Sequence, residues 1–595
     1  MNCEVRVRTL VALVGCSLAC AASAAQPTIV PDALTARAKI LKALGGEQRL
    51  ANFTALHAVG SMEGVSGFPG RYELWAQAPA NRAVTWDIGY LRQTTAVDAQ
   101  GAWERVTETR ELAGAELART RRDGRFAPLY KLLKEGAALT VSEGQCGPTS
   151  VYTLAAAAPG DLRESWGIDR KSFLPVCAVR TEVYEEGPQE VRLDYADYRS
   201  VRGLMLPFSV NETRPDVSLK VRIERYEVNP TISSDVFANP QRAHWNEPVV
   251  MRLATLPSQV YREDDGNFSI GSQRFWGMYF YQSASWSFDL MVKEQYGRFI
   301  EPLHARAELY AGDTLVGSQE WDRPMLEAMR RAPVTRFSPQ GEIYGFRHNF
   351  STPQGVAVDR IAYTLEARDA HGDTQHQTLS IPIRTYRPHA RLIFPMKGKF
   401  LVTSGHEYYE LEHKYERSQQ FAIDVVALGD DFEFARHDGA SMEDYVGYGR
   451  RAILAPAAGT VVFARNDIPD GTVKADFLKK EYALEAIAGN LVVIDHGNGE
   501  FSVFCHMRHG SVAVRRGDRI EQGQTIGYLG AAGSPGLPHL HYQLQNGPNI
   551  FGNDGLPLVF ENIERIGWLG RGASDDTPGA AAVEQPRSGV YMIAR

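Results

Sequence analysis

Long apolar runs and closely spaced cysteine pairs are both scarce in this chain of 595 residues. Beyond the N-terminal segment, no stretch approaches the roughly 18 apolar residues that a membrane-spanning helix needs, so the sequence predicts no transmembrane span in the mature chain. No CxxC motif, internal repeat or coiled-coil heptad pattern is present. The G-x-S-x-G motif is absent as well, which disfavours a serine hydrolase.

An excess of basic charge is also lacking. The chain has 64 Lys and Arg against 71 Asp and Glu, a formal net charge of −7. This balance favours neither a nucleic-acid partner nor a strong attraction to anionic lipid. Hydrophobic residues make up 44% of the chain, which is ordinary for a globular protein. At roughly 100–200 residues per domain, the length predicts about three domains.

The N-terminus has the pattern of a targeting segment. Arg6 and Arg8 precede the mostly apolar stretch from Thr9 to Ala22, and Ala22-Ser23-Ala24 resembles a signal-peptidase site. We therefore predict a signal peptide over residues 1–25 and secretion across the inner membrane, with the periplasm as the expected compartment. The alternative is a lipoprotein anchored at Cys16, because Leu13-Val14-Gly15-Cys16 resembles a lipobox; plain secretion is favoured.

Three cysteines remain after the predicted signal, namely Cys146, Cys177 and Cys505. Cys146 and Cys177 lie near turn-forming Gly and Pro, and they could pair in an oxidising compartment. The spacing alone does not decide whether they do. Cys505 lies within an apolar run and is expected to be a small buried residue.

The first unit, residues 26–240, starts with a helical pattern from Leu34 to Leu50 that Gly45-Gly46 interrupts. Alternating stretches separated by turn residues then indicate antiparallel strands. The helix, the segment ALHAVGSM and the late segments DYADYRSVRGLMLPFSV and YEVNP resemble the periplasmic lipoprotein-carrier (Lol) half-barrel. That resemblance implies a curved sheet over a helix with an apolar concavity, and a lipid or lipoprotein partner. A β-domain that serves only as a spacer is the alternative.

Two further units and a tail complete the predicted organisation. Residues 246–386 contain alternating strands, with a turn at His371-Gly372-Asp373, that suggest an immunoglobulin-like β-sandwich. Residues 391–568 contain short strands bounded by glycine, and the Ala-, Gly- and Ser-rich tail 569–595 is expected to be disordered. The predicted fold class is thus mainly β and multidomain.

Candidate chemistry is concentrated in the last of these units. His539-Leu540-His541 places two imidazoles on one face of a strand, since residues two apart point the same way. His506 follows the strand-like FSVFC, where alternation would place it with Phe504 and away from Cys505. Asp424 lies inside the apolar run FAIDVV, and a buried carboxylate needs a partner, either a salt bridge or a metal.

Taken in order, the segments of this unit resemble the blocks of lysostaphin-type zinc endopeptidases. The matching segments are FAIDVV, APAAGTVVFA, GNLVVIDHGNG, FSVFCHM, GDRIEQGQTIGYLGAAGS and PHLHYQL. The resemblance implies a two-sheet β-core with a groove, and hydrolysis of the peptide cross-links of peptidoglycan. It also implies that Asp424 and His541 are zinc ligands, and that His506 and His539 are the catalytic pair that orients the water and stabilises the oxyanion.

One position departs from that family. The family has a His four residues before the Asp, and this chain has Gln420 there. A neutral amide oxygen is a poorer zinc donor than imidazole. Gln420 could still bind zinc weakly, or His413 or His406 could supply the missing nitrogen; His437 is a less favoured donor. The third alternative is a degenerate site without a catalytic metal.

Two functions therefore compete. The first is a secreted zinc metallo-endopeptidase that acts on peptidoglycan peptides. The second is a catalytically silent protein that binds the cell wall or activates another hydrolase. A cysteine hydrolase is disfavoured because strand alternation would send Cys505 and His506 to opposite faces.

Overall fold

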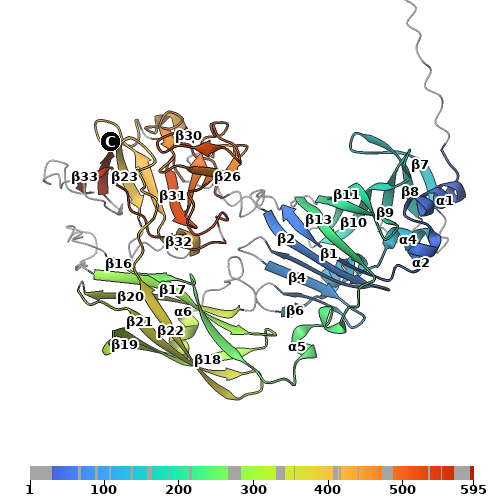
Figure 1. Cartoon of the computed structure of the whole chain (residues 1–595), viewed down its shortest axis with the longest axis horizontal. Helices are drawn as coiled ribbons and strands as arrows, with labels where there is room; N and C mark the ends of the chain where they lie inside the picture. The colour runs from blue at the N-terminus through green and yellow to red at the C-terminus, as the bar shows by residue number, and fades with distance from the viewer. Residues whose placement is uncertain are drawn as a thin grey trace, which may run out of the picture.

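The computed structural model describes residues 30–595 except 64–68, 88–91, 106–108, 135–138, 157–163, 185–186, 214–217, 265–282, 330–341, 354, 406–412, 414–416, 438, 440, 472–486, 534–535, 551 and 569–589. The chain is mainly β, as predicted, and nearly all strand pairs are antiparallel. Figure 1 shows the strands gathered in three regions that follow one another along the chain. The predicted signal peptide, residues 1–25, lies outside the described residues.

The N-terminal region is built on one 13-stranded sheet with the order β6-β5-β4-β3-β2-β1-β13-β12-β11-β10-β9-β8-β7. Its strands are β1 (Ala55–Glu63), β2 (Pro69–Gln77), β3 (Asn81–Asp87), β4 (Arg92–Val97), β5 (Ala102–Arg105), β6 (Thr109–Glu111), β7 (Leu139–Cys146), β8 (Thr149–Ala156), β9 (Glu164–Asp169), β10 (Pro175–Tyr184), β11 (Gly187–Val201), β12 (Leu204–Thr213) and β13 (Ser218–Val228). Its helices are α1 (Ala33–Ala43), α2 (Glu47–Ala51), α3 (Gly114–Asp123) and α4 (Pro128–Lys134), and η1 (Ser234–Val236) and α5 (Pro240–Ala243) follow the sheet.

The helical prediction for the start of this region is confirmed. Asp32 caps α1 by accepting a hydrogen bond from the Thr35 backbone N–H at 2.8 Å. The chain breaks between α1 and α2 because Gly45 has a φ of +123°. A Cβ atom at Gly45 would also come within 2.3 Å of the Gly203 carbonyl oxygen, so glycine is required there. Buried residues of α1 and α4, including Ile40 and Leu133, pack against the sheet in one apolar core.

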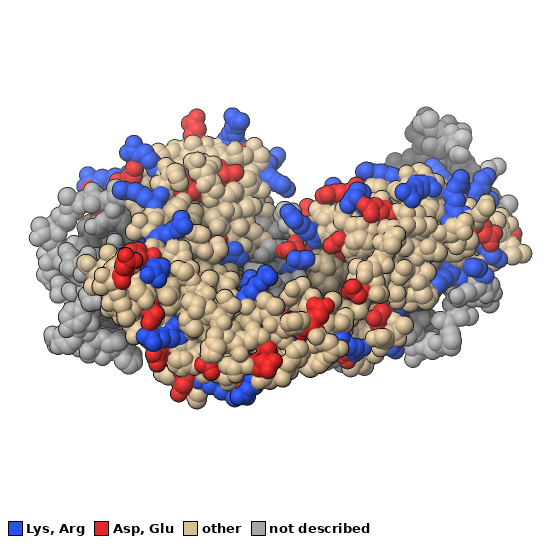
Figure 2. Space-filling model, turned by 60° about the horizontal axis from the view of Figure 1, so that its bottom comes forward, with Lys and Arg blue, Asp and Glu red and all other residues tan. Residues whose placement is uncertain are grey.

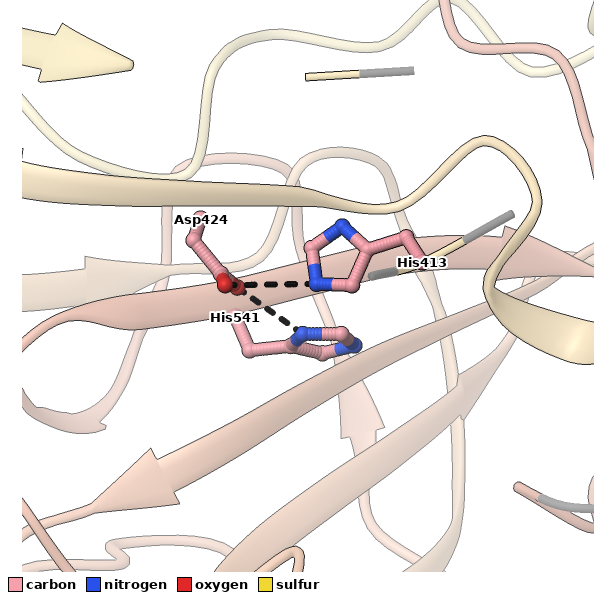
Figure 3. A group of neighbouring side chains, drawn as sticks. All are labelled: His413, Asp424 and His541. Carbon is pink, nitrogen blue, oxygen red and sulfur yellow. Dashed lines mark hydrogen bonds and ion pairs between the residues drawn. The ribbon is translucent and has the colours of Figure 1, made fainter. Parts of the chain in front are cut away.

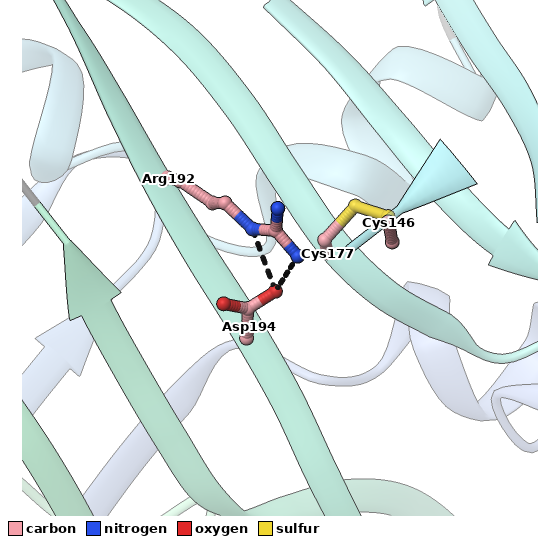
Figure 4. Close-up of a disulfide and its surroundings, with 4 residues drawn as sticks. All are labelled: Cys146, Cys177, Arg192 and Asp194. Atoms are coloured by element: carbon pink, nitrogen blue, oxygen red, sulfur yellow. Dashed lines mark hydrogen bonds and ion pairs between the residues drawn. A yellow bond between two sulfur atoms is a disulfide. The ribbon is translucent and has the colours of Figure 1, made fainter. Parts of the chain in front are cut away.

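The two cysteines that could pair do so. Cys146 at the end of β7 and Cys177 on β10 form a disulfide, with the Arg192–Asp194 ion pair of β11 beside it (Figure 4). A Cβ atom added to Gly167 would lie 2.2 Å from the Cys146 sulfur, so the strand between the two cysteines must carry glycine at this point. Such a bond agrees with the oxidising compartment expected from the sequence.

The central region contains two sheets that share one core. The first has the order β14-β17-β16 with β20 beside β17, and the second has the order β15-β22-β21-β18-β19. The predicted turn at His371-Gly372-Asp373 is confirmed, because it joins β21 to β22. The elements are β14 (Met251–Leu256), β15 (Val260–Tyr261), β16 (Glu263–Asp264), β17 (Ser283–Glu294), β18 (Ile300–Ala311), β19 (Thr314–Asp322), α6 (Arg323–Met329), β20 (Glu342–Pro353), β21 (Arg360–Asp369) and β22 (Thr374–Arg384).

A histidine lies inside this central core. His348 is 1% exposed, with its ring centroid 4.6 Å from that of Trp321. Its Nε2 shares a hydrogen bond of 2.9 Å with the Tyr363 hydroxyl. Burial, reinforced by the charge of Arg347, lowers the pKa of His348 from 6.5 to about 3. The folded protein therefore holds this ring neutral at pH values where the unfolded chain protonates it.

We expect this histidine to make the folded state sensitive to mild acid. The unfolded chain binds a proton near 6.5 and the folded chain only near 3, so stability falls as the pH drops below 6.5. Between about pH 7 and about pH 5, His348 should contribute a loss of about 2 kcal/mol in the free energy of unfolding. Chemical unfolding of wild type and His348→Phe over this range measures it as the difference in pH slope. The exposed His376→Asn is the control, and an unchanged slope in His348→Phe would contradict the assignment.

The C-terminal region holds a large sheet with the order β29-β26-β27-β28-β31-β24-β23-β34-β33, with β32 beside β31, and a small sheet of β25 and β30. Its elements are β23 (Gly398–Ser404), η3 (Arg417–Gln419), β24 (Ile423–Ala427), η4 (Met442–Asp444), β25 (Ala452–Leu454), β26 (Gly459–Arg465), β27 (Asn490–Asp495), β28 (Phe501–Met507), β29 (Arg519–Ile520), β30 (Thr525–Tyr528), β31 (Leu540–Gln545), β32 (Gly555–Leu556), β33 (Ile563–Trp568) and β34 (Val590–Ala594). One apolar core unites both sheets, with Phe394, Phe504 and Phe560 fully buried in it.

The predicted disorder of residues 569–595 is wrong for the last part of the chain. Strand β34 pairs with β23 and with β33, and Met592 is buried in the core of the region. The Ala-, Gly- and Ser-rich composition concealed a short apolar segment, VYMIA, that pairs with β33 and with β23, a strand from far earlier in the sequence. Local composition cannot show such a distant partner.

Charges of both signs are interspersed on the face of the molecule drawn in Figure 2. Neither sign forms a continuous field there, in keeping with the small net charge of −7. In the part of the chain that the structure describes, no helix combines the length and the apolarity that crossing a membrane requires.

Candidate metal centre

Three neighbouring strands bring the predicted site residues together. Asp424 of β24 lies directly opposite His541 of β31, and His541 lies opposite Cys505 of β28 on its other side. Side chains that oppose each other in an antiparallel ladder point to the same face of the sheet. His539 precedes His541 by two residues and reaches the same carboxylate, as its spacing predicted. This face of the large sheet is called the site face below.

The carboxylate of Asp424 lies at the centre of the cluster. His413 Nε2 lies 3.2 Å from its Oδ2, and His541 Nδ1 lies 2.9 Å from its Oδ1 (Figure 3). His539 Nε2 lies 3.4 Å from the same Oδ1. One ligand atom from each of His413, Asp424 and His541 lies within 4.8 Å of the other two. Residues that are widely separated in the sequence thus converge on a volume that one ion could occupy.

The hydrogen bonds on the far side of each ring fix where its proton lies. His413 Nδ1 is 3.3 Å from the Ala422 carbonyl oxygen, and His539 Nδ1 is 2.9 Å from that of Leu537. A carbonyl oxygen can only accept, so each of these nitrogens carries the hydrogen. In the neutral rings, the nitrogens that face Asp424 are therefore bare lone pairs. Acceptors that converge on a carboxylate need a cation between them, and this donor set fits a metal ion.

The charges of the cluster are strongly coupled. Burial raises the pKa of Asp424, but the neighbouring His413 and His539 outweigh burial and hold that pKa well below its ordinary value of 3.8. Burial lowers the pKa of His539, and the Asp424 carboxylate reverses this and raises it above 6.5. The carboxylate is thus ionised, and it is the counter-charge for any cation held here.

His506 reaches the cluster by an irregular backbone. Its φ is +59°, and the pairing of β27 with β28 shifts register between Asn490 and Val492, which is a β-bulge. The expectation that His506 shares the face of Phe504 is therefore wrong: Phe504 is in the core, whereas the His506 ring lies 4.8 Å from that of His539. A period-two pattern cannot reveal a bulge.

The environment of His506 favours its neutral form. Its Nδ1 donates to the Ala532 carbonyl oxygen at 2.9 Å, so Nε2 is an acceptor when the ring is neutral. Burial, followed by the neighbouring His539 and His541, lowers the pKa of His506 to about 3. Next to it, burial raises the pKa of the Cys505 thiol, which makes a thiolate nucleophile at this position unfavourable.

Gln420, the residue that departs from the family pattern, makes its hydrogen bond away from Asp424. The Gln420 side chain is buried, and its Nε2 donates to the Ser287 carbonyl oxygen of the central region at 3.3 Å. Among the described residues, His413 lies in one group of possible metal ligands with Asp424 and His541. His437 is exposed, and its φ is +55°, whereas His406 lies outside the described residues. Sequence alone left His413 as one of several donors because it stands at no regular spacing from Asp424.

The N-terminal sheet covers part of the site face. Met62 of β1 is buried in one apolar cluster with Leu491, Val493, Val503 and Cys505 of the C-terminal sheet. Val493 and Val503 oppose each other, as Cys505 and His541 do, so these contacts lie on the site face. All four histidines of the centre are at most 7% exposed. The cluster is therefore buried in this arrangement, and Met62 packs beside it on the site face.

Comparison with known proteins agrees with the motifs. Residues 436–551 match the model of Peptidase family M23, which is the lysostaphin-type family, and therefore form an M23 domain. This stretch includes His506, His539 and His541 and begins after His413 and Asp424.

Two relatives from Vibrio cholerae match shorter stretches. Peptidoglycan DD-endopeptidase ShyC is 45% identical over 95 residues, which is 16% of this chain and 19% of the relative. Peptidoglycan DD-endopeptidase ShyA is 42% identical over 57 residues, which is 10% of this chain and 13% of the relative. The alignments thus span less than a fifth of either relative. The N-terminal part also matches the structure of a LolA superfamily protein from Nitrosomonas europaea with a TM-score of 0.24 and 10% identity, covering 36% of this chain and 98% of that one.

Proposed function

We propose that this protein is a secreted zinc metallo-endopeptidase that hydrolyses peptide cross-links of peptidoglycan. The observation that carries the proposal is the convergence of His413, Asp424 and His541 within 4.8 Å. Two imidazoles and one carboxylate are a donor set typical of catalytic zinc, which leaves one coordination position for water or substrate. The two relatives named above, both peptidoglycan DD-endopeptidases, support the choice of substrate.

In this proposal His413, Asp424 and His541 hold the zinc, through Nε2, a carboxylate oxygen and Nδ1 respectively. When bound, zinc lowers the pKa of a water toward about 7 and polarises a carbonyl group. In this proposal His413, and not Gln420, is the third zinc ligand. The N–H groups on the far sides of the rings, held by Ala422 O and by Gln543, keep the ligating nitrogens aimed at the ion.

His539 and His506 are the proposed catalytic residues beside the metal. His539 Nε2 is bare in the neutral ring, and the adjacent Asp424 carboxylate stabilises the imidazolium that forms when the ring accepts a proton. His539 is therefore the general base that takes the proton of the attacking water. His506 presents a second bare Nε2 and orients that water by accepting a hydrogen bond. It can donate to an oxyanion only in its charged form, since Nδ1–H is committed to Ala532.

The test measures metal content and hydrolysis separately. Purified protein should contain about one zinc per chain by elemental analysis, and it should release peptide fragments from isolated peptidoglycan. A chelator should abolish hydrolysis, and added zinc should restore it. Because the centre is buried, Met62→Asp should be assayed in parallel, since a carboxylate in that apolar contact would loosen the cover on the site face.

The silent binding protein remains the competing function. Protein that contains no zinc but still binds isolated peptidoglycan would support the silent function and contradict the enzymatic one. If the protein contains zinc but does not hydrolyse peptidoglycan, even as the Met62→Asp variant, the proposed metal site stands and peptidoglycan is ruled out as the substrate. Secretion follows from the predicted signal peptide; anchoring at Cys16 is the less favoured variant of that proposal.

The N-terminal region supports a second function, the binding of an apolar ligand such as an acyl chain. It contains a cavity of about 370 Å³ lined mostly by apolar side chains, among them Leu56, Leu74, Phe126 and Leu206. Ligand pockets commonly start at about 300 Å³ and are largely apolar. Lipid that copurifies with wild type, and is lost in Leu206→Glu, would support a lipid or lipoprotein partner. Failure to bind a fluorescent fatty acid would favour the spacer alternative.

A further inference from the structure

A row of buried side chains on one face of strand β31 continues from the proposed metal ligand His541, on the side of its ring away from Asp424. His541, Gln543 and Gln545 alternate along the strand, and the two glutamines are 0% exposed. His541 Nε2 lies 2.9 Å from Gln543 Oε1, and Gln543 Nε2 donates to Gln545 Oε1 at 2.5 Å. The row ends at two backbone carbonyls, because Gln545 Nε2 donates to Gly547 O at 2.5 Å and to Asn549 O at 3.0 Å.

The two carbonyls set the direction of the whole row. Because a carbonyl oxygen only accepts, Gln545 must turn its NH₂ group toward Gly547 and Asn549. Its oxygen then faces Gln543 and requires an N–H from it, so Gln543 must turn its own oxygen toward His541. That oxygen requires the hydrogen of His541 on Nε2. The opposite nitrogen, Nδ1, is left bare, and it is the one that faces Asp424 at 2.9 Å.

We infer that Gln543 is a positioning residue, which with Gln545 locks His541 into the tautomer and ring orientation that bind the metal. The inference rests on the proposed zinc site and identifies what prepares it before any ion arrives. A free imidazole interconverts between two neutral tautomers and rotates about its side-chain bonds, and the row excludes the neutral tautomer whose single proton is on Nδ1. Outer partners of this kind typically contribute 10–100-fold to metal affinity.

Zinc affinity, measured by competition with a chromophoric chelator on the full chain, tests this role without depending on turnover. Gln543→Leu keeps the size of the side chain but removes the acceptor, and zinc binding should weaken about 10–100-fold. Gln543→Glu restores an acceptor for His541 and should recover most of the affinity. Ser502→Ala is the matched control: it removes the buried hydrogen bonds of Ser502 to His496 and Tyr542 in the same sheet, on the opposite face. It should lower the unfolding temperature and leave zinc affinity unchanged.

The outcomes separate this inference from the proposed function. If His541→Ala loses zinc but Gln543→Leu binds it as tightly as wild type, the metal site stands and the positioning role is overturned. A Ser502→Ala variant that weakens zinc as much as Gln543→Leu would also overturn it, because the effect would then be general destabilisation. If His541→Ala itself retains zinc, the metal site is misplaced, and the positioning role fails with it.

Discussion

His413→Ala is expected to strip zinc from the protein and to abolish hydrolysis, whereas Gln420→Ala should leave both nearly intact. His413 Nε2 lies 3.2 Å from the central carboxylate, and its Nδ1 is held by the Ala422 carbonyl oxygen. Gln420 instead donates to Ser287 in the central region. Loss of a ligand should cost more zinc affinity than the roughly 10–100-fold that an outer partner contributes.

The two variants form a matched pair because both side chains are buried and neither lies on a regular strand. Removing the Gln420 hydrogen bond to Ser287 should cost about 1 kcal/mol of stability, a loss visible in the unfolding temperature but not in the zinc content. Elemental analysis and chelator competition give the metal content of each variant. Zinc that survives in His413→Ala and disappears from Gln420→Ala would reverse the assignment and restore the family pattern.

The sequence predicted the convergence of Asp424 on β24 with His541 on β31 better than it predicted which further side chain approaches them. Asp424 lies on β24 and His541 on β31, and His539 comes directly before β31, two residues from His541, so a period of two decides which side chains share a face. His413 lies outside the strands, and only the folded chain shows that it approaches Asp424 whereas Gln420 donates to Ser287. The carboxylate inside the apolar run FAIDVV nevertheless signalled that a partner was required.

The fold shows the same division between local and distant determinants. The break between α1 and α2, the mainly β class and the hairpin turn at residues 371–373 follow from local residue types, and all are confirmed. Strand β34 depends on β23, a partner far away in the sequence, and the bulge at His506 depends on an irregular pairing of β27 with β28; both predictions there were wrong. The half-barrel and immunoglobulin-like assignments and the domain limits stay predictions.

His539→Ala is expected to separate metal binding from catalysis. The variant should keep its zinc, because His413, Asp424 and His541 are untouched, while kcat falls by about 10²–10⁴-fold with the loss of the general base. His539→Gln should behave in the same way, since an amide fills the space but cannot take a proton at neutral pH. The measurements are zinc content and initial rates of peptide release. Both are made in wild type or in the Met62→Asp variant, whichever has the higher activity.

The proposed roles of His539 and His541 differ although both contact Asp424. His539 comes directly before β31 and His541 lies on it, and they are 3.4 Å and 2.9 Å from one carboxylate oxygen of Asp424, so contact alone does not distinguish their roles. Their outer partners do. Among the described residues, the His541 ring is fixed by a row of amides anchored on two carbonyls, whereas the outer nitrogen of His539 bonds to the nearby Leu537 carbonyl oxygen. A ligand needs a ring that stays in place, and a base needs a free lone pair beside the metal. If His539→Ala lost zinc as completely as His541→Ala, His539 would be a ligand and the base would have to be sought in His506.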